Sequence, residues 1–522
     1  YTSQALNKKL NRECEFLLRD AELLSCFDPA FPASYPQADL EAAWKLVLLN
    51  QFHDIIPGSS VKEVYDDSTR DYAKVQEAGE RIVAEKLRAI GSRMASEAAQ
   101  RPYALFQNSI VPTQASIPWT EEFVPASLTA GEETLPVQLV EEFGERKLIF
   151  PTPAAALGTV AVGDFTDATP SYRPRLKASN RRIENDVLSV RFDPHGNITS
   201  IQTEDGTEFI EAGKLANLFQ IFEDKPNFWS AWDIDAFALE TGTDLIRSES
   251  FEIVERGPVR VAAEIVKRFG NSTIRQRISL GPTPGVRFDT EIDWHEEDKL
   301  LKVAFPVNVN SPRATYEIQF GHVERPTHRN TSWDMARFEV CAQKWIDLSE
   351  GGQGVALLND GKYGHDTFGN VMRMSLLRAP KAPDPTCDMG RHRFTYVVMP
   401  HFMPFAFDSV VASAYALNAP LRAAALEPGS GAEGPLPQLV SCSNRNVVIE
   451  TVKKAEDSDD LIVRLYECHN TRGRAELSVV RRPSAAWLCD LEENPIAELE
   501  VGEGLVGFDF KPFEIVTIKL RC

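Results

Sequence analysis

The run WKLVLLNQFHDIIPGSS, residues 44–60, organises the first hundred residues of this chain. Its spacing predicts a helix from about Asp39 to Ile55 that stops at Pro57-Gly58, because proline interrupts helices and glycine ends many of them. At 100° per residue, apolar side chains fall on both sides of this helix. One face carries Leu40, Trp44, Val47, Leu48 and Ile55, and the other carries His53 flanked by Ala42, Leu46 and Leu49. We expect such a helix to be covered twice, by its own domain and by a second partner.

Two further helices are predicted on either side of this run. Upstream, leucines recur at helical spacing from Leu6 to Leu24, and the segment is ended by Pro29, Pro32 and Pro36. Downstream, Ser60-Val61-Lys62-Glu63 has the pattern of a capping box, which predicts the start of a helix that continues to about Met94. Three helices with short connections predict a three-helix bundle over residues 1–102.

After Pro102 the hydrophobic period changes from 3.6 to 2, as in Leu188-Ser189-Val190-Arg191-Phe192. We therefore predict an α+β multidomain protein in which mostly antiparallel β-sandwich domains follow the helices. Breaks in composition predict a small β domain at 103–178, a large β-sandwich domain at 179–427 and a C-terminal β domain at 436–522. A Gly- and Pro-rich linker at 428–435 precedes the last of these domains.

The composition excludes some classes of partner. The chain has 522 residues and a net charge of -20, which repels phosphate groups and argues against nucleic acid and anionic membranes as partners. No stretch of 18 consecutive apolar residues is present, so no membrane span is predicted. The eight cysteines form no C-x-x-C pair, and scattered thiols of this kind indicate a reducing cytoplasm.

The residue types alone leave the role of His53 open. A single histidine on an apolar helix is more often a core residue than a metal ligand, although the neighbouring Asp54 suits a metal or sugar site. No second ligand lies at a workable spacing, so the sequence by itself closes no metal site. Alternating acids such as Asp289, Glu291 and Asp293 are expected on a solvated strand face. Most of the tryptophans in the β region are expected in sandwich cores.

The run at 49–60, LNQFHDIIPGSS, resembles a signature of the α-mannosidases of glycoside hydrolase family 38, and most closely the cytosolic type. Further resemblances to the family occur in order along nearly the whole chain. They are the runs at 1–5 (YTSQA), 232–235 (WDID), 299–307 (KLLKVAFPV), 325–328 (RPTH), 330–334 (NTSWD), 345–350 (WIDLSE), 357–360 (LLND), 362–364 (KYG) and 375–380 (SLLRAP).

The resemblance implies a retaining exo-α-mannosidase with one divalent metal, usually zinc and in some cases cobalt. By the match, His53 is a metal ligand and Asp54 is a sugar-contacting carboxylate. The nucleophile, the acid/base and the other metal ligands would lie in an N-terminal catalytic domain that this chain lacks. We therefore expect the fragment to be inactive alone and to bind metal weakly. Phe52 stands where Golgi-type members often carry another histidine, which is interpreted as a subtype difference.

Two functions remain open at this point. One is a part of an exo-α-mannosidase whose partners are mannose-containing oligosaccharides and the missing catalytic domain, with self-association into a homo-oligomer as a further expectation. The other is a self-sufficient carbohydrate-binding or scaffold module. Loops of the large β domain reach the active-site rim in this family, and Tyr363 and Arg378 lie in the corresponding stretches.

Overall fold

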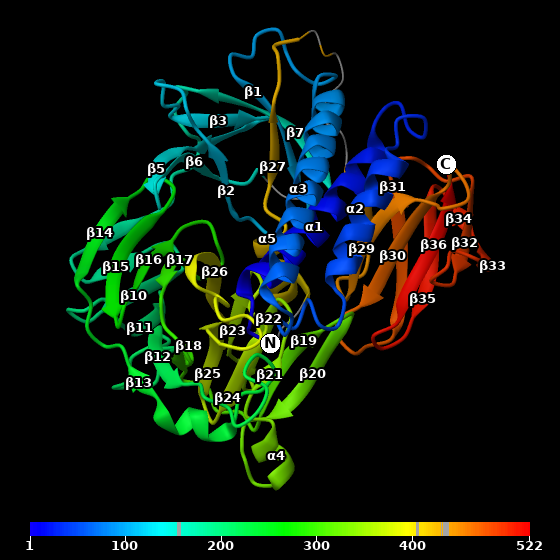
Figure 1. Cartoon of the computed structure of the whole chain (residues 1–522). Helices are drawn as coiled ribbons and strands as arrows, with labels where there is room; N and C mark the ends of the chain where they lie inside the picture. The colour runs from blue at the N-terminus through cyan, green and yellow to red at the C-terminus, as the bar shows by residue number, and fades with distance from the viewer. Residues whose placement is uncertain (154–157, 403–406, 430, 432–437) are drawn as a thin grey trace.

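The computed structural model describes residues 1–153, 158–402, 407–429, 431 and 438–522. Long helices occupy the first hundred residues and antiparallel strands make up most of the rest, so the predicted α+β class is confirmed. In Figure 1 the three N-terminal helices stand at the centre, with β sheets on both sides of them and below them. No helix in these described ranges is long and apolar enough to cross a membrane.

The helices α1 (Ala5–Phe27), α2 (Gln37–Asn50) and α3 (Lys62–Gly91) pack against one another. Their shared core buries Leu17, Val47 and Ile82. Gly79 of α3 allows a close approach to α1, since a Cβ atom there would lie 2.7 Å from Cγ of Leu17. Shorter helices occur later in the chain: the 3-10 helix η1 (Ala236–Thr241), α4 (Ser332–Ala336), the π-helix η2 (Phe407–Val411) and α5 (Ala412–Asn418).

The structure corrects two details of the predicted helices. The second helix ends at Asn50, so His53 and Ile55 lie in the following turn and not on a helix face. At its end the Asn50 side chain donates to the carbonyl of Leu46 at 2.9 Å, and the backbone continues in turns such as that closed by the Phe52 amide on the carbonyl of Leu49 at 3.1 Å. The predicted capping box is also wrong. The N-cap of α3 is Val61, which makes no side-chain cap, and the Ser60 hydroxyl instead donates to the carbonyl of Asp54 at 2.6 Å.

Two small sheets follow the helices. In strand order, one contains β27 (Arg422–Ala425), β1 (Pro102–Gln107), β7 (Thr159–Thr166), β3 (Ser127–Ala130) and β4 (Glu133–Pro136), and the other contains β2 (Gln114–Pro118), β6 (Glu145–Pro151) and β5 (Gln138–Glu142). The edge strand β27 pairs with β1 in the register Tyr103 to Ala425. The first sheet is thus completed by a segment that the sequence-based division placed in the large β domain.

The central β region contains a long sheet and two smaller ones. In strand order, the long sheet is β14 (Ser250–Arg256), β15 (Val261–Phe269), β16 (Ser272–Leu280), β17 (Val286–Trp294), β26 (Gly390–His401), β23 (Gly354–Asn359), β22 (Trp345–Ser349), β19 (Arg313–Ile318) and β20 (Gly321–Pro326). A second sheet is β13 (Thr243–Asp244), β12 (Leu218–Glu223), β18 (Lys299–Pro306), β25 (Val371–Arg378), β24 (Gly364–Phe368) and β21 (Val340–Cys341). A third is β11 (Ile198–Thr203), β10 (Leu188–Phe192), β9 (Arg182–Glu184) and β8 (Lys177–Ser179). Their apolar faces share one core, which includes Phe288 and Tyr396.

The last region packs against the N-terminal helices. Its sheets are β28 (Val440–Cys442), β31 (Gly473–Val479), β35 (Leu505–Phe510) and β34 (Val501–Gly502), and β29 (Val447–Lys454), β30 (Leu461–Glu467), β36 (Ile515–Arg521), β32 (Ala485–Cys489) and β33 (Pro495–Leu499). Arg19 of α1 donates to the carbonyls of Ile449 and Glu450 in β29, at 3.0 and 2.6 Å. Most of the predicted linker, residues 430 and 432–435, lies outside the described residues.

A buried ionic cluster joins the small sheet that contains β5 to the long sheet. Arg260, whose side chain is fully buried, donates to Glu142 of β5 at 3.0 Å and to Glu255 of β14 at 2.7 Å. Its third nitrogen lies 3.7 Å from Asp289 of β17. A charge buried this deeply is stable only while its partners remain in place.

Candidate functional site

His53 and Asp54 project from the turn between α2 and α3. The side chains are 74% and 53% exposed, and Nε2 of His53 lies 3.4 Å from Oδ2 of Asp54. The imidazole also contacts the Phe52 ring, at 4.3 Å between ring centroids. The turn therefore presents a nitrogen donor and a carboxylate side by side to the solvent.

The backbone of this turn is held from below by α1. The Lys8 ammonium is buried and donates to the carbonyls of Ser3, Ile56 and Pro57 at 2.5, 2.8 and 3.2 Å. Burial lowers the pKa of Lys8 to about 8. Gly58 has φ +93°, and a Cβ atom there would lie 2.5 Å from the carbonyl oxygen of Ser3. The lysine and the glycine thus fix the backbone beneath the exposed pair.

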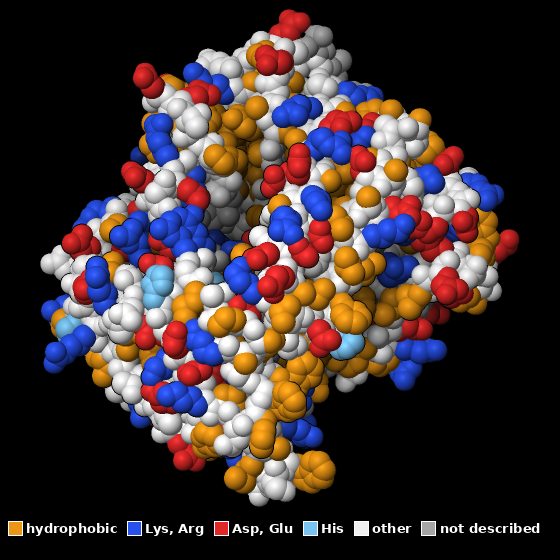
Figure 2. Space-filling view, in the orientation of Figure 1, with side chains coloured by type: hydrophobic (Ala, Val, Ile, Leu, Met, Phe, Trp, Pro, Cys, Tyr) orange, Lys and Arg blue, Asp and Glu red, His pale blue; other side chains and the backbone are white. Residues whose placement is uncertain are grey.

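A hollow of about 600 Å³ adjoins Asp54. Its walls come from the turn after α2 and from two loops of the central β region: Asp54, Ser59, Trp229, Ser230, Ala231, Trp232, Ala382 and Pro383. Figure 2 shows hydrophobic side chains gathered from below α2 down to α4 on the face of the molecule in view. The site therefore combines polar groups at the tip of the turn with an aromatic wall beside them.

The donor set of the turn accounts for only part of a metal site. In the part of the chain that the structure describes, no cluster of three or more His, Cys, Asp or Glu side chains could hold a metal ion. A structural or catalytic zinc site normally takes at least three protein ligands. His53 and Asp54 could contribute two donors to such a site, but they do not form one by themselves.

Models of one family match three parts of the chain. The alpha mannosidase middle domain matches residues 1–90, the glycosyl hydrolases family 38 C-terminal domain matches 183–386, and the family 38 C-terminal beta sandwich domain matches 446–518. The chain belongs to glycosyl hydrolase family 38. It is 38% and 39% identical to alpha-mannosidase 2C1 of Mus musculus and of Homo sapiens, and 30% identical to an alpha-mannosidase of Saccharomyces cerevisiae. These alignments cover all of this chain but 49%, 49% and 47% of the relatives, so the chain spans about half of their length.

A solved structure has the same fold as this family 38 chain. An alpha-mannosidase from Enterococcus faecalis superposes with a TM-score of 0.82 at 17% identity, over 100% of this chain and 68% of that one. At this identity the comparison concerns the fold alone. It supports the arrangement of helices and sheets described above.

The structure also places the other residues singled out in the sequence, which are Tyr363, Asp289 and the tryptophans of the β region. Tyr363 accepts a hydrogen bond from Arg12 of α1 at 2.9 Å, and burial raises its pKa to about 12. Asp289, expected on a solvated face, is instead buried beside Arg260 and Arg287, because it belongs to the cluster that joins two sheets. The expectation that tryptophans fill cores holds for Trp294 and Trp345, which are buried.

The same expectation is wrong for Trp229, Trp232 and Trp333, which are exposed. Their exposure could not be inferred from residue type, because tryptophan is common both in cores and at binding surfaces. The WDID run that contains Trp232 indicated the family resemblance but not the exposure of the Trp232 side chain. It did not show which way the side chain points.

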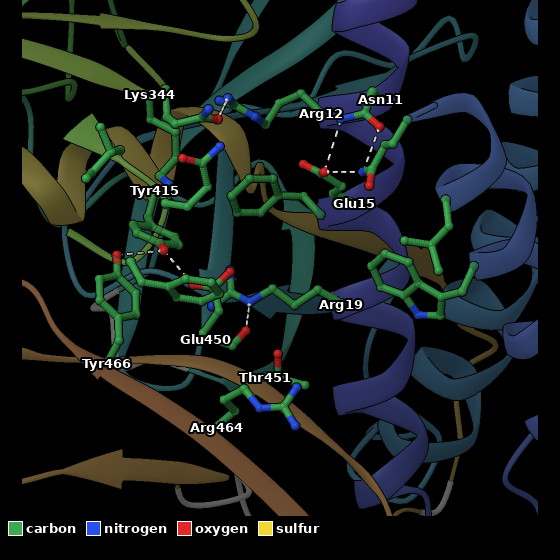
Figure 3. Close-up of a pocket in the computed structure, with 18 of the residues that line it drawn as sticks. Asn11, Arg12, Glu15, Arg19, Lys344, Tyr415, Glu450, Thr451, Arg464 and Tyr466 are labelled. Atoms are coloured by element: carbon green, nitrogen blue, oxygen red, sulfur yellow. Dashed lines mark hydrogen bonds between the residues drawn. The ribbon is translucent and has the colours of Figure 1, made fainter. Parts of the chain in front are cut away.

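A second pocket of about 570 Å³ lies between α1, α2, α5, the central β region and the C-terminal β region. Figure 3 shows Arg12, Glu15 and Arg19 projecting from α1 toward this space, with Tyr415, Glu450 and Tyr466 on the opposite side. The Arg19 guanidinium lies over the rings of Phe16 and Tyr415, at 5.5 and 5.4 Å from their centroids. Since these charged groups are engaged with one another and with aromatic rings, we interpret the pocket as a polar seam between regions of the fold.

Glu22, which lines this pocket, leads us to predict that the stability of the folded protein depends on pH. It is buried and accepts a hydrogen bond from Trp44 at 3.1 Å, and burial raises its pKa to about 7 despite Lys453 and Arg464 nearby, with Glu456 adding to the rise. A carboxyl group whose pKa is raised by folding favours the folded state at low pH, and this contribution is lost as pH rises from the unfolded pKa to about 7. We expect Glu22→Gln to stabilise the protein, relative to wild type, by up to about 3 kcal/mol more at pH 8 than at pH 5.

Urea unfolding of both proteins at the two pH values measures this difference. Glu85→Gln is the matched control, because Glu85 is exposed on α3. A constant gap between Glu22→Gln and wild type across the pH range would contradict the expectation.

Proposed function

We propose that this chain is the middle and C-terminal part of a retaining, metal-dependent exo-α-mannosidase that removes α-linked mannose from oligosaccharides. The observation that carries the proposal is the turn after α2, whose backbone is held by Lys8. On this turn Nε2 of His53 lies 3.4 Å from Oδ2 of Asp54, and both side chains are exposed to solvent. An exposed imidazole and carboxylate on a fixed backbone suit a site completed by a facing domain. Relatives of about twice the length that bear the name alpha-mannosidase support this reading.

In this proposal His53 is one ligand of a divalent metal, zinc or cobalt, and Asp54 contacts the sugar. When bound, the metal would hold hydroxyl groups of mannose and stabilise charge in the transition state. The histidine suits this role because its ring nitrogen is accessible and the Phe52 ring and Asp54 restrict its orientation. The two residues account for at most two positions around the metal.

The other half of the enzyme is proposed to supply the remaining groups. A retaining glycosidase needs a nucleophilic carboxylate and an acid/base carboxylate about 5 Å apart. The helix α2 and the turn after it offer a surface for that half, since Ala42 and Leu49 are exposed on the helix and Phe52 is exposed next to His53. Without a covering domain this apolar surface would favour self-association of the chain into a homo-oligomer.

The proposed setting is the cytoplasm, and the proposed substrates are neutral oligosaccharides. All eight cysteines lie in the described ranges and all are free thiols, which suits a reducing compartment. The net charge of -20 disfavours nucleic acid and anionic membrane surfaces as partners but has little effect on a neutral sugar.

Comparison of residues 1–522 with the full-length enzyme tests the proposal. We expect the full-length enzyme to hydrolyse an aryl α-mannoside, and residues 1–522 alone to show no turnover above background. The reason is that His53 and Asp54 provide neither the nucleophile nor the acid/base group. Turnover by residues 1–522 that survives purification and is lost in His53→Ala would contradict the proposed division of the site. Oligosaccharide binding by residues 1–522, together with an inactive full-length protein, would instead favour a carbohydrate-binding module.

A further inference from the structure

The loop at 224–235 holds two exposed indole rings beside Asp54. Trp229 is 76% exposed and Trp232 is 58% exposed, and both line the hollow that Asp54 borders. Trp229 also has a φ of 55°, a left-handed conformation that bulky residues rarely adopt. Large exposed aromatic side chains in a strained backbone mark positions that the surrounding structure holds in place.

Arg378 fixes this loop from beneath. Its buried guanidinium donates twice to Asp224, at 2.6 and 3.1 Å. It also donates to the carbonyls of Ser230 and Asp233, at 2.9 and 2.6 Å. Within the loop, the amide of Trp232 donates to the carbonyl of Trp229 at 2.7 Å. Because the backbone is already ordered, a ligand that stacks on the two rings would lose little affinity to ordering of the loop.

A second anchor links the loop to the turn that carries His53 and Asp54. The Ser3 hydroxyl donates to the carbonyl of Ala231 at 3.0 Å, and the carbonyl of Ser3 accepts from Lys8. Lys8 in turn donates to Ile56 and Pro57. The aromatic loop and the turn with His53 are therefore positioned by the same short segment of chain.

The chemistry of the hollow indicates a neutral, hydroxyl-rich ligand. Asp54 is the charged side chain among the described lining residues, and the Ser59 and Ser230 side chains are polar. A volume of about 600 Å³ is within the range of small-ligand sites. A pyranose ring has an apolar face of C–H groups that can be buried on an indole, while its hydroxyl groups reach the polar wall.

We propose that Trp229 and Trp232 bind the sugar unit next to the mannose that is removed, and so determine the preference for oligosaccharides over simple mannosides. This inference rests on the proposed function. A protein surface is a poorer occupant of the hollow, because an apolar cover would take the Asp54 carboxylate out of water, and the His53 imidazole at 3.4 Å offsets only part of that cost. The tryptophan loop and Ala382-Pro383 both line the hollow, and walls that come from two loops suit a small ring better than a flat domain surface.

The test uses the full-length enzyme with Trp229→Ala and Trp232→Ala, assayed on a manno-trisaccharide and on an aryl α-mannoside. We expect the ratio of kcat/KM for the trisaccharide to kcat/KM for the aryl mannoside to fall at least tenfold in each variant, mainly through KM of the trisaccharide. Phenylalanine at either position should restore part of the ratio, since a smaller ring still stacks. Trp333→Ala is the matched control, because Trp333 is 76% exposed on α4 and outside the hollow. It should leave the ratio unchanged.

Two results would overturn the inference. One is an unchanged ratio in both alanine variants. The other is an equal fall for both substrates accompanied by a lower melting temperature, which would assign the rings to a contact with the rest of the enzyme. If the wild-type enzyme cleaves neither substrate, the proposed function itself fails. If the wild-type enzyme is active and the ratio is unchanged in the alanine variants, only the sugar-binding role of Trp229 and Trp232 is rejected.

Discussion

In the full-length enzyme, we expect His53→Ala to lower kcat/KM for an aryl α-mannoside by about a thousandfold and to remove most of the bound divalent metal. The expected size follows from the several kcal/mol that a metal ion contributes to transition-state stabilisation, at 1.36 kcal/mol for each tenfold change in rate. The turn should keep its shape in the variant, because Lys8 and Gly58 hold the backbone and His53 is exposed. Metal analysis after dialysis and steady-state kinetics measure the two effects.

His295→Ala is the matched control. His295 is also exposed and lies 2.9 Å from a neighbouring carboxylate, that of Asp293, yet it is far along the chain from the turn. It should retain full activity and metal content. Residues 1–522 alone should hold much less than one metal ion per chain after dialysis. Near-stoichiometric metal in residues 1–522, or full activity in His53→Ala, would remove His53 from the metal site.

We expect Arg260→Ala to destabilise the junction between the sheet that contains β5 and the long sheet by about 3–5 kcal/mol. The substitution leaves Glu142, Glu255 and Asp289 buried without the cation that they share. Hydrogen exchange should accelerate first in β5 and β14, which carry two of these carboxylates. The thermal unfolding midpoint of the whole chain should fall as well.

Arg268→Ala is the control that separates the effect of burial on stability from the effect of charge. Arg268 pairs with Glu249 at 2.8 Å, but both side chains are exposed. Surface ion pairs of this kind contribute about 0–1 kcal/mol, so exchange rates should stay near those of wild type. Equal effects of the two substitutions would show that burial of Arg260 is not what makes its cluster important.

The helices were the most predictable part of the fold, yet their ends were not. Period 3.6 and the prolines after Leu24 indicated long N-terminal helices, as observed. The end of α2 depends on the Asn50 side chain and on Lys8, which binds the following turn from another helix. Local spacing does not contain that tertiary contact. His53 therefore lies on a turn instead of a helix face, although its place beside Asp54 was predicted.

The β region was predictable in kind but not in pairing. Alternation identifies strands such as Leu188–Phe192, but it does not show which strand is the partner, and a partner can lie hundreds of positions away, as β27 does from β1. The burial of charged side chains was not predictable either. Asp289 lies in an alternating pattern that is typical of a solvated strand face, but it is buried in an ionic cluster. In the candidate site, the motif at residues 49–60 predicted His53 and Asp54 as site residues. The exposed Trp229 and Trp232 could be recognised only once their loop was seen beside them.

The strand β27 has a consequence for synthesis on the ribosome. Chains emerge from the N-terminal end, and β1 is complete at Gln107, but its neighbour β27 follows only at Arg422–Ala425. Until then the outer edge of β1 has unpaired backbone groups, the kind of edge that recruits other chains. The sheet that contains β1 must therefore wait for more than three hundred residues of translation before it is complete. Release of a chain that stops before Arg422 would yield a product prone to aggregate through β1.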